Sequence, residues 1–274
     1  MNATVFVSPE NSTTVRSIDA TTAARRFAEA PAVRAPRIPE IEGTPTERST
    51  LVVSDQPLSV YQWGQGRAPA VLLAHGFGGS AAQLTAFVPA LLAAGYRVVA
   101  FDQPAHGTSP GRYVHLVDFA RNITAVAGAF GARSVIAHSL GAVATLIAHS
   151  RGLPVDRAAL IAPPSNVEHF AAAFASAIGL PPTELPAMLT EVERELGYPL
   201  RLLDVRNLAG LVDGAPADVL VLHDEADAEV PYAHGRALAE HWPIARLVTL
   251  HGVGHRRVLR DATAIALSTR HITQ

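Results

Sequence analysis

Short apolar runs alternate with segments of helical spacing along most of the chain. Runs at 70–74, 96–101, 134–137, 157–161, 218–222 and 246–250 have the length and composition of buried strands, and 51–53 with 58–63 form an opening hairpin. The segments 81–94, 119–130 and 140–150 are expected to be helices. This order predicts βαβ units, hence an α/β fold with a mostly parallel, twisted sheet flanked by helices.

The alternation is interrupted after the apolar run at 157–161. The residues Ser165 to Glu168 match a capping box, which predicts a helix that contains Phe170 and Phe174. A second helix is expected at 183–196, with Met188 on its apolar side. We therefore expect a small helical cap inserted at about 163–212. The alternative, that these helices merely complete the outer layer, stays open.

Residues 1–48 are rich in Thr, Pro, Ala and Arg and are interpreted as an N-terminal extension. A short helix is expected around 18–30, and the prolines that follow it prevent its continuation. Such linker composition rarely carries a site, so we expect a surface arm without chemistry, with the α/β domain at 49–274. Residues 1–20 lack the cationic start and apolar run of a secretory signal.

Composition removes several classes of chemistry. The 274 residues include no Lys and no Cys, which excludes a lysine Schiff base, a P-loop lysine, disulfides, thiol nucleophiles and cysteine zinc sites. The formal net charge of −2 gives no electrostatic reason to bind nucleic acid. No stretch approaches the roughly 18 apolar residues of a membrane span. We expect a cytoplasmic protein that acts on a small molecule without cofactor or metal; the oligomeric state stays open.

The strongest local signal is the segment Ala137-His-Ser-Leu-Gly141, which joins a buried strand to a helix. Such a small-x-Ser-x-Gly turn is the pattern of a nucleophile elbow, in which Ser139 stands at strained backbone angles. Ala137 replaces the usual first glycine. Because the following helix directs its N-terminal N–H groups at the site, the Leu140 amide is expected to stabilise an oxyanion, and His138 to line the pocket.

A second signal is the loop His75-Gly-Phe-Gly-Gly79, between a strand and a helix. Its glycines allow backbone N–H groups to point into a cavity, so the Phe77 amide is the expected second oxyanion donor and the Phe77 ring an acyl contact. The spacing does not match a dinucleotide fingerprint, and the absence of lysine excludes a P-loop.

A nucleophilic serine needs a base and a carboxylate that orients it. His255 follows the last predicted strand at the sheet edge where ligands bind, and is assigned as general acid and base, with His251 as its rival. His75 and His106 are expected to hold their loops. Among the acids after the strand at 218–222, Asp227 is chosen over Asp224; Glu225 and Glu229 complete a cluster that is less typical of a metal site.

With these residues assigned, the chain from about 51 to 270 resembles the α/β-hydrolase superfamily. The order Ser139, Asp227, His255 is the chain order of that fold. Four motifs carry the resemblance: His-Gly-Phe-Gly-Gly, Phe-Asp-Gln-Pro-Ala-His-Gly-x-Ser, Ala-His-Ser-Leu-Gly and the pair Asp…Val-Pro with Gly-His. It implies oxyanion amides at Phe77 and Leu140, and hydrolysis of esters, thioesters or amides.

The favoured function is a serine esterase for an apolar acyl group of small or medium size, bound by Phe77, His138, Phe170, Phe174 and Met188. The same catalytic groups would also serve a thioesterase, lactonase, amidase or acyltransferase. A binding protein of this fold without catalysis is the other alternative.

Overall fold

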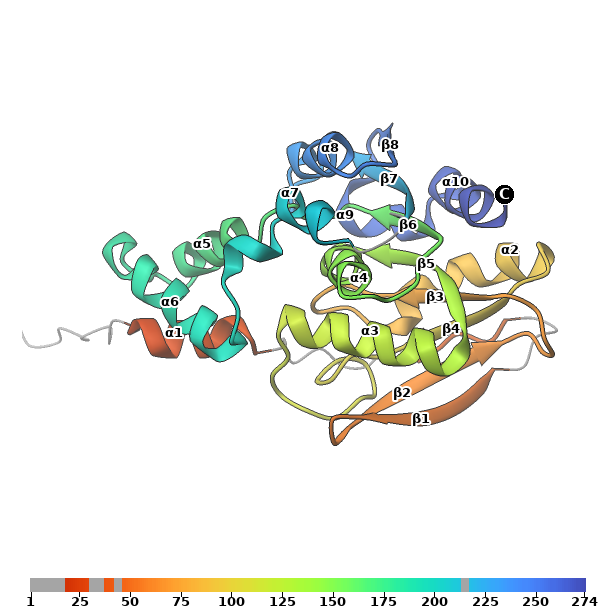
Figure 1. Cartoon of the computed structure of the whole chain (residues 1–274), viewed down its shortest axis with the longest axis horizontal. Coiled ribbons are helices and arrows are strands. Elements are labelled where there is room, and N and C mark those ends of the chain that lie inside the picture. The colour runs from red at the N-terminus through yellow and green to blue at the C-terminus, as the bar shows by residue number, and fades with distance from the viewer. Residues whose placement is uncertain (1–17, 30–36, 42–45, 213–216) are drawn as a thin grey trace, which may run out of the picture.

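An eight-stranded sheet forms the centre of the protein in the computed structural model, which describes residues 18–29, 37–41, 46–212 and 217–274. The strands lie in the order β1-β2-β4-β3-β5-β6-β7-β8 (Figure 1). Their bounds are β1 (Glu47–Val53), β2 (Gln56–Trp63), β3 (Ala70–Ala74), β4 (Arg97–Phe101), β5 (Ala132–His138), β6 (Arg157–Ile161), β7 (Asp218–Asp224) and β8 (Ala245–Leu250).

The sheet is parallel except for its first two strands. β1 and β2 form an antiparallel hairpin, and β2 pairs antiparallel with β4. All pairings from β4 to β8 are parallel, so the carboxyl ends of these strands meet at one edge. The predicted α/β class and mostly parallel sheet are confirmed, with strand ends that differ from expectation by a few residues.

Helices cover both faces of the sheet. The helices α3 (Leu116–Phe130), α4 (Leu140–Ser150) and α8 (Tyr232–His241) pack into one hydrophobic core, and α2 (Val88–Ala93) and α10 (Ala262–Thr273) into the other. The wholly buried strand β3 contributes Leu72 to the first core and Leu73 to the second, because successive side chains of a strand point to opposite faces. Two short helices, α7 (Val205–Leu208) and α9 (Gly254–Arg257), lie in the connections beside the sheet.

Three helix predictions need correction. The helix expected at 81–94 is a 3-10 segment (Ala81–Phe87) followed by α2, whose second residue is Pro89 and lacks the N–H that a continuous helix would use. Helix α3 begins three residues earlier than expected, at Leu116. Asn166, and not Ser165, caps the next helix, because its side chain accepts the amides of Glu168 and His169.

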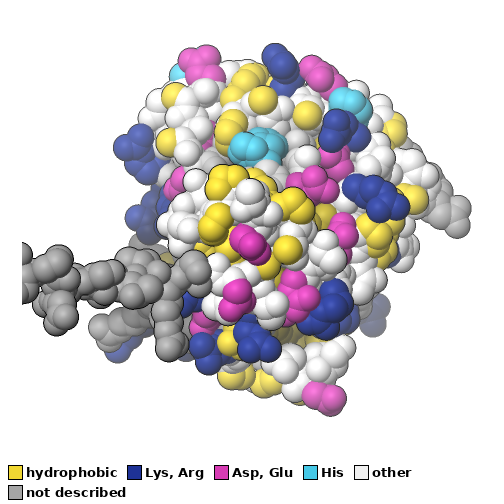
Figure 2. Space-filling view, turned by 90° about the vertical axis from the view of Figure 1, so that its left-hand side faces the viewer, with side chains coloured by type: hydrophobic (Ala, Val, Ile, Leu, Met, Phe, Trp, Pro, Cys, Tyr) yellow, Lys and Arg dark blue, Asp and Glu magenta, His cyan; other side chains and the backbone are white. Residues whose placement is uncertain are grey.

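Helices inserted between β6 and β7 lie beyond the carboxyl edge of the sheet. The main ones are α5 (Val167–Ala177) and α6 (Leu185–Leu196), with 3-10 segments at Pro182–Glu184, Leu200–Leu203 and Ala209–Leu211. In Figure 1 they project to the left of the sheet together with α1 (Ala20–Phe27). Figure 2 looks onto this end, where hydrophobic side chains gather in the middle and charged side chains surround them.

The N-terminal segment differs from the expected surface arm. Helix α1 forms where a short helix was predicted, but Ala23 and Ala24 are completely buried in the same core as α5 and α6. Of the predicted extension, residues 1–17, 30–36 and 42–45 lie outside the described part. Within the described ranges, none of the helices is both long and apolar enough to cross a bilayer.

Candidate active site

Ser139 stands at the sharp turn between β5 and α4. Its backbone angles are φ 51° and ψ −122°, a conformation that costs a residue with a Cβ atom of order 1–3 kcal/mol. The surrounding contacts keep the strained turn in place, since the Ser139 amide donates to the carbonyl of Ile161 on the neighbouring strand at 2.9 Å. The predicted elbow is therefore present as a local structure, with a partly exposed serine at its tip.

Two glycines allow other backbone segments to approach this turn. A Cβ atom on Gly141 would lie 2.4 Å from the carbonyl oxygen of His75, and one on Gly76 would lie 2.8 Å from the Cβ of Ser139. Neither position has room for a side chain. The glycine-rich loop after β3 thus packs directly on the serine, and Gly76 also lies beside the amide nitrogen of Leu140.

Leu140 is the first residue of α4, so its N–H has no carbonyl partner within the helix. This N–H is one of the free donors that make the N-terminal end of the helix positive. Phe77 belongs to the loop that packs on Ser139, and both residues line a cavity with Ser139. These positions agree with the two amides that the sequence assigns to an oxyanion, and that assignment remains a prediction.

His255 and Asp227 form a buried pair beside Ser139. The Nδ1 of His255 donates to Oδ2 of Asp227 at 2.8 Å, and the two side chains are 8% and 0% exposed. His255 and Ser139 line one small pocket. Because Nδ1 is bound to the carboxylate, Nε2 is the imidazole nitrogen left for a serine hydroxyl. The three residues chosen from the sequence are thus brought together at one edge of the sheet.

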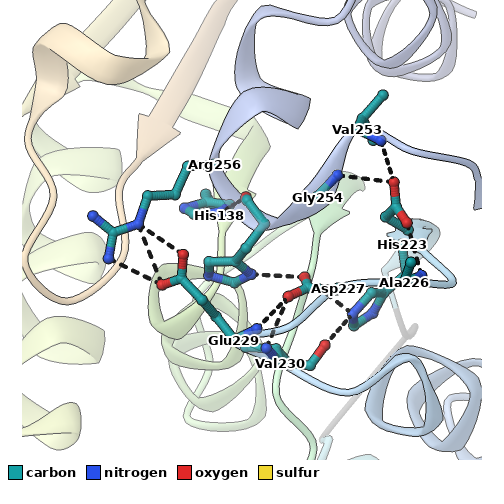
Figure 3. Close-up of polar contacts among 11 residues, drawn as sticks. His138, His223, Ala226, Asp227, Glu229, Val230, Val253, Gly254 and Arg256 are labelled. Atoms are coloured by element: carbon teal, nitrogen blue, oxygen red, sulfur yellow. Dashed lines mark hydrogen bonds and ion pairs between the residues drawn. The ribbon is translucent and has the colours of Figure 1, made fainter.

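Asp227 is held as a carboxylate by a ring of donors (Figure 3). Its Oδ1 accepts the amides of Glu229 and Val230. The Nε2 of His223 donates to the carbonyl of Val230 at 2.8 Å and lies 3.5 Å from Oδ2 of Asp227. Burial alone would raise the pKa of Asp227, but the interactions with His223, His255 and Val230 outweigh it and lower that pKa below its ordinary value. Sequence reasoning missed His223, which lies inside the β7 strand and carried no motif signal.

Asp224, the alternative choice for the orienting acid, binds backbone amides. Its carboxylate accepts the amides of Val253 and Gly254, in the loop that leads to His255, and also that of Ala226. Its pKa is lowered because these three amide bonds outweigh the effect of burial. Asp224 therefore fastens the loop of Asp227 to the loop of His255, and it does not contact the imidazole through these bonds.

Three other histidines that the sequence singles out, His75, His106 and His251, do not contact Asp227. His251 is 68% exposed at its side chain and pairs with Glu225 at 2.7 Å, away from the buried pair. The Nδ1 of His75 donates to the carbonyl of Gly76, while its Nε2 accepts the amide of Gln103. His106 accepts the amide of Gly78 in the same way, so two neutral imidazoles brace the glycine-rich loop. Burial lowers the pKa of His75 to about 4 and also lowers that of His106.

An apolar cavity of about 280 Å³ opens on one side of Ser139. Phe77, Phe170 and Phe174, three of the residues that the sequence places at the acyl group, line it, whereas Met188 does not; Leu140 lines it as well. Met188 is 0% exposed and belongs to the hydrophobic core, because the apolar side of α6 packs inward there. The cavity also has walls that the sequence did not suggest, among them residues 26–29 of the N-terminal segment and 114–116 at the start of α3.

On the other side of Ser139 lies a smaller, polar pocket. His138, Gln83, Glu229 and Arg256 line it together with the glycine-rich loop. Arg256 and Glu229 form an exposed ion pair at 2.9 Å, visible at the left of Figure 3 beside His138. Ser139 therefore stands between an apolar cavity and a polar pocket.

Comparisons with known proteins identify the family and the fold. The model of the alpha/beta hydrolase family matches residues 71–266. No curated protein matches the sequence significantly. An esterase from Pyrococcus furiosus has a similar structure, with TM-score 0.66, 18% identity, and coverage of 89% of this chain and 99% of that chain.

Two further solved structures share the fold with similar TM-scores and sequence identities. A 2-hydroxy-6-oxo-6-phenylhexa-2,4-dienoate hydrolase from Rhodococcus sp. strain RHA1 has TM-score 0.63 and 19% identity, with 84% of this chain and 100% of that chain covered. An epoxide hydrolase from Mycobacterium thermoresistibile has TM-score 0.60 and 19% identity, over 83% and 98% of the two chains. At such identities the likeness concerns the fold alone, and these neighbours act on chemically different substrates.

Proposed function

Because the chain belongs to the alpha/beta hydrolase family, we propose that it is a serine hydrolase that cleaves carboxylic esters through an acyl-enzyme on Ser139. The proposal rests on one observation above all. A buried imidazole, that of His255, is oriented by a buried carboxylate and lines the same pocket as a serine held in a strained turn. This is the arrangement that activates a serine hydroxyl.

In the proposed reaction, Nε2 of His255 accepts the proton of the Ser139 hydroxyl as the oxygen attacks the ester carbonyl. Asp227 stabilises the imidazolium that forms, since its lowered pKa keeps it ionised. The amides of Phe77 and Leu140 stabilise the oxyanion, a contribution of roughly 3–4 kcal/mol for each donor. His255 then returns the proton to the leaving alcohol.

Deacylation repeats these steps with water in place of the serine. His255 accepts a proton from the water as its oxygen attacks the acyl-enzyme. The second tetrahedral species then collapses, the bond to the Ser139 oxygen breaks, and His255 returns the proton to that oxygen as the acid leaves. Nothing in this cycle calls for a metal or an organic cofactor. The apolar cavity supports an uncharged acyl group, and the polar pocket supports a small leaving alcohol.

Covalent labelling with a fluorophosphonate tests the proposal directly. We expect stoichiometric labelling of the wild-type protein at Ser139, found by peptide mass spectrometry, and turnover of simple aryl esters. Ser139→Ala should lose both, while Ser150→Ala, at the far end of α4, should keep both. Ester hydrolysis at the wild-type rate by Ser139→Ala, or labelling at another residue, would exclude the proposed nucleophile.

Matched oxygen esters and thioesters with the same acyl group separate the esterase from a thioesterase. We expect the higher kcat/KM on the oxygen ester. A clear preference for the thioester would keep Ser139 as nucleophile but change the substrate class.

A further inference from the structure

The apolar cavity beside Ser139 is closed by a part of the chain that precedes the family match. Helix α1 ends at Phe27, and the cavity wall includes Arg26, Phe27, Ala28 and Glu29. The family model begins only at residue 71. The wall formed by α1 is therefore an addition to the region that defines the family in this chain.

Helix α1 is fixed to the inserted helices by burial. Asp19 caps its N-terminus by accepting the amide of Thr22 at 2.7 Å, and Ala23 and Ala24 are completely buried. The helix packs against α6 and α5, which also line the cavity. Removing α1 would expose the apolar sides of both helices, so it is an integral part of the cap.

The segment after α1 is fastened to the other side of the cavity. The amide of Val114 donates to the carbonyl of Ala28 at 3.0 Å, and Glu29 forms a β-bridge with Tyr113. Glu29 also pairs with Arg112 at 2.7 Å. The segment thus spans from the inserted helices to the loop before α3, and it closes the cavity along that side.

Phe27 is the large apolar side chain that this segment contributes to the cavity. It is half-buried, and its ring lies 5.4 Å from that of Phe174, at an angle of 55° between the planes. Both rings line the same cavity as Ser139. A chain that extends from Ser139 into this space therefore meets an aromatic pair with one member from α1 and one from α5.

We propose that α1 is a specificity element, and that Phe27 limits the length of the hydrocarbon acyl group bound beside Ser139. This inference rests on the proposed ester hydrolysis and deepens it. The lining is apolar, and the cavity volume of about 280 Å³ is just below the range of small-molecule sites, roughly 300–1,000 Å³, which fits a single acyl chain of limited length.

Two substitutions of opposite size test the role of Phe27. Phe27→Ala enlarges the cavity and should shift the preferred p-nitrophenyl ester, in a series from acetate to laurate, towards longer chains. Phe27→Trp should shift it towards shorter ones. Each methylene gained or lost should change kcat/KM about fourfold, the equivalent of ~0.8 kcal/mol for a buried methylene. Thr21→Ala, an exposed position on the same helix, serves as the control and should keep the wild-type profile.

Binding measured without turnover separates this inference from the proposed function. In a Ser139→Ala background, saturated fatty acids from butyrate to myristate should displace a fluorescent fatty acid, with a preferred length that follows the residue at position 27. If esters are turned over but the preferred length is unchanged in both Phe27 variants, the role of Phe27 is wrong and the hydrolase stands. If binding follows Phe27 but no ester is cleaved, the hydrolase proposal fails instead.

The two variants also distinguish a changed cavity wall from a detached helix. If the substitutions detached α1, both should broaden the range of chain lengths accepted, in the same way. If Phe27 forms the wall, the preferred chain length should shift in opposite directions. Shifts in the same direction, or no length-dependent binding at all, would overturn the inference.

Discussion

The imidazole Nε2 of His138 donates to the backbone carbonyl of His255 at 2.9 Å, and the two rings lie 4.6 Å apart. His138 immediately precedes the proposed nucleophile, so one hydrogen bond joins the elbow to the loop that carries the proposed base. The bond requires a proton on Nε2, and burial together with the nearby His255 lowers the pKa of His138 to about 3.

Stability should therefore fall in mild acid, and His138 should contribute to the fall. In the unfolded chain this histidine takes up a proton near pH 6.5, whereas in the folded protein it stays neutral down to about pH 3. Between these values the unfolded state binds more protons, so the free energy of unfolding decreases as pH falls. The loss from pH 7 to pH 5 should be about 2 kcal/mol for this residue.

Urea unfolding at the two pH values measures the effect. His138→Gln keeps a donor for the carbonyl of His255 but removes the titration, so its midpoint should fall less between pH 7 and pH 5 than that of the wild type. His251→Gln, which removes an exposed histidine, is the control and should show the wild-type fall. If the midpoint fell equally in all three proteins, folding would not lower the pKa of His138, and this prediction would be wrong.

Asp227→Asn should remove most of the catalytic rate and little of the stability. The asparagine oxygen can still accept the amides of Glu229 and Val230, but its NH₂ group would face His255 and favour the wrong imidazole tautomer. By analogy with the same change in a serine protease, kcat should fall about 10⁴-fold. Ester hydrolysis under saturating substrate gives kcat, and an unchanged value would exclude Asp227 as the orienting acid.

Asp224→Asn should reduce the stability more, and kcat less, than Asp227→Asn. Its carboxylate joins the two loops through the amides of Val253, Gly254 and Ala226, and one asparagine oxygen cannot replace both carboxylate oxygens. We expect a loss of about 1–3 kcal/mol in the free energy of unfolding, with a smaller loss of kcat than in Asp227→Asn. A larger loss of kcat in Asp224→Asn would reverse the roles of the two acids.

The strands and the elbow could be predicted because their signals are local. Each buried strand is a short apolar run, and the turn at Ser139 requires small residues within two positions. The break in the helix expected at 81–94 also has a local signal, Pro89. The cap by Asn166 has none, because it depends on which of two adjacent polar residues has the backbone angles of a cap.

The wall of the cavity could not be predicted because its contacts are distant in sequence. Whether Met188 points into the core or the cavity depends on how α6 is rotated against its neighbours, which the apolar spacing of one helix does not define. Helix α1 looked like part of a linker, and only its packing against α6 makes it a wall of the site. His223 lies only four residues before Asp227, but their approach depends on how the loop after β7 folds back onto that strand, which the residue types do not define.

Gly141→Ala and Gly128→Ala both place alanine in a helix, but only the first adds a Cβ atom where the backbone is closely packed at the site. A Cβ on Gly141 would lie 2.4 Å and 2.7 Å from the carbonyl oxygens of His75 and Ala74, so Gly141→Ala must displace the end of β3 and the glycine-rich loop. We expect a loss of roughly 1–3 kcal/mol in unfolding free energy, as for other overpacked sites, and a large loss of kcat.

Gly128→Ala is the matched control, because this glycine lies within α3 and a Cβ there would meet no atom within 4 Å. It should stabilise the protein by about 0.4–1 kcal/mol, since alanine restricts the unfolded chain, and leave kcat unchanged. Urea unfolding and ester hydrolysis of both variants give the comparison. If Gly141→Ala were as stable and active as Gly128→Ala, the start of α4 would have freedom to move away from β3, and the oxyanion amide proposed at Leu140 would lose its rigid support.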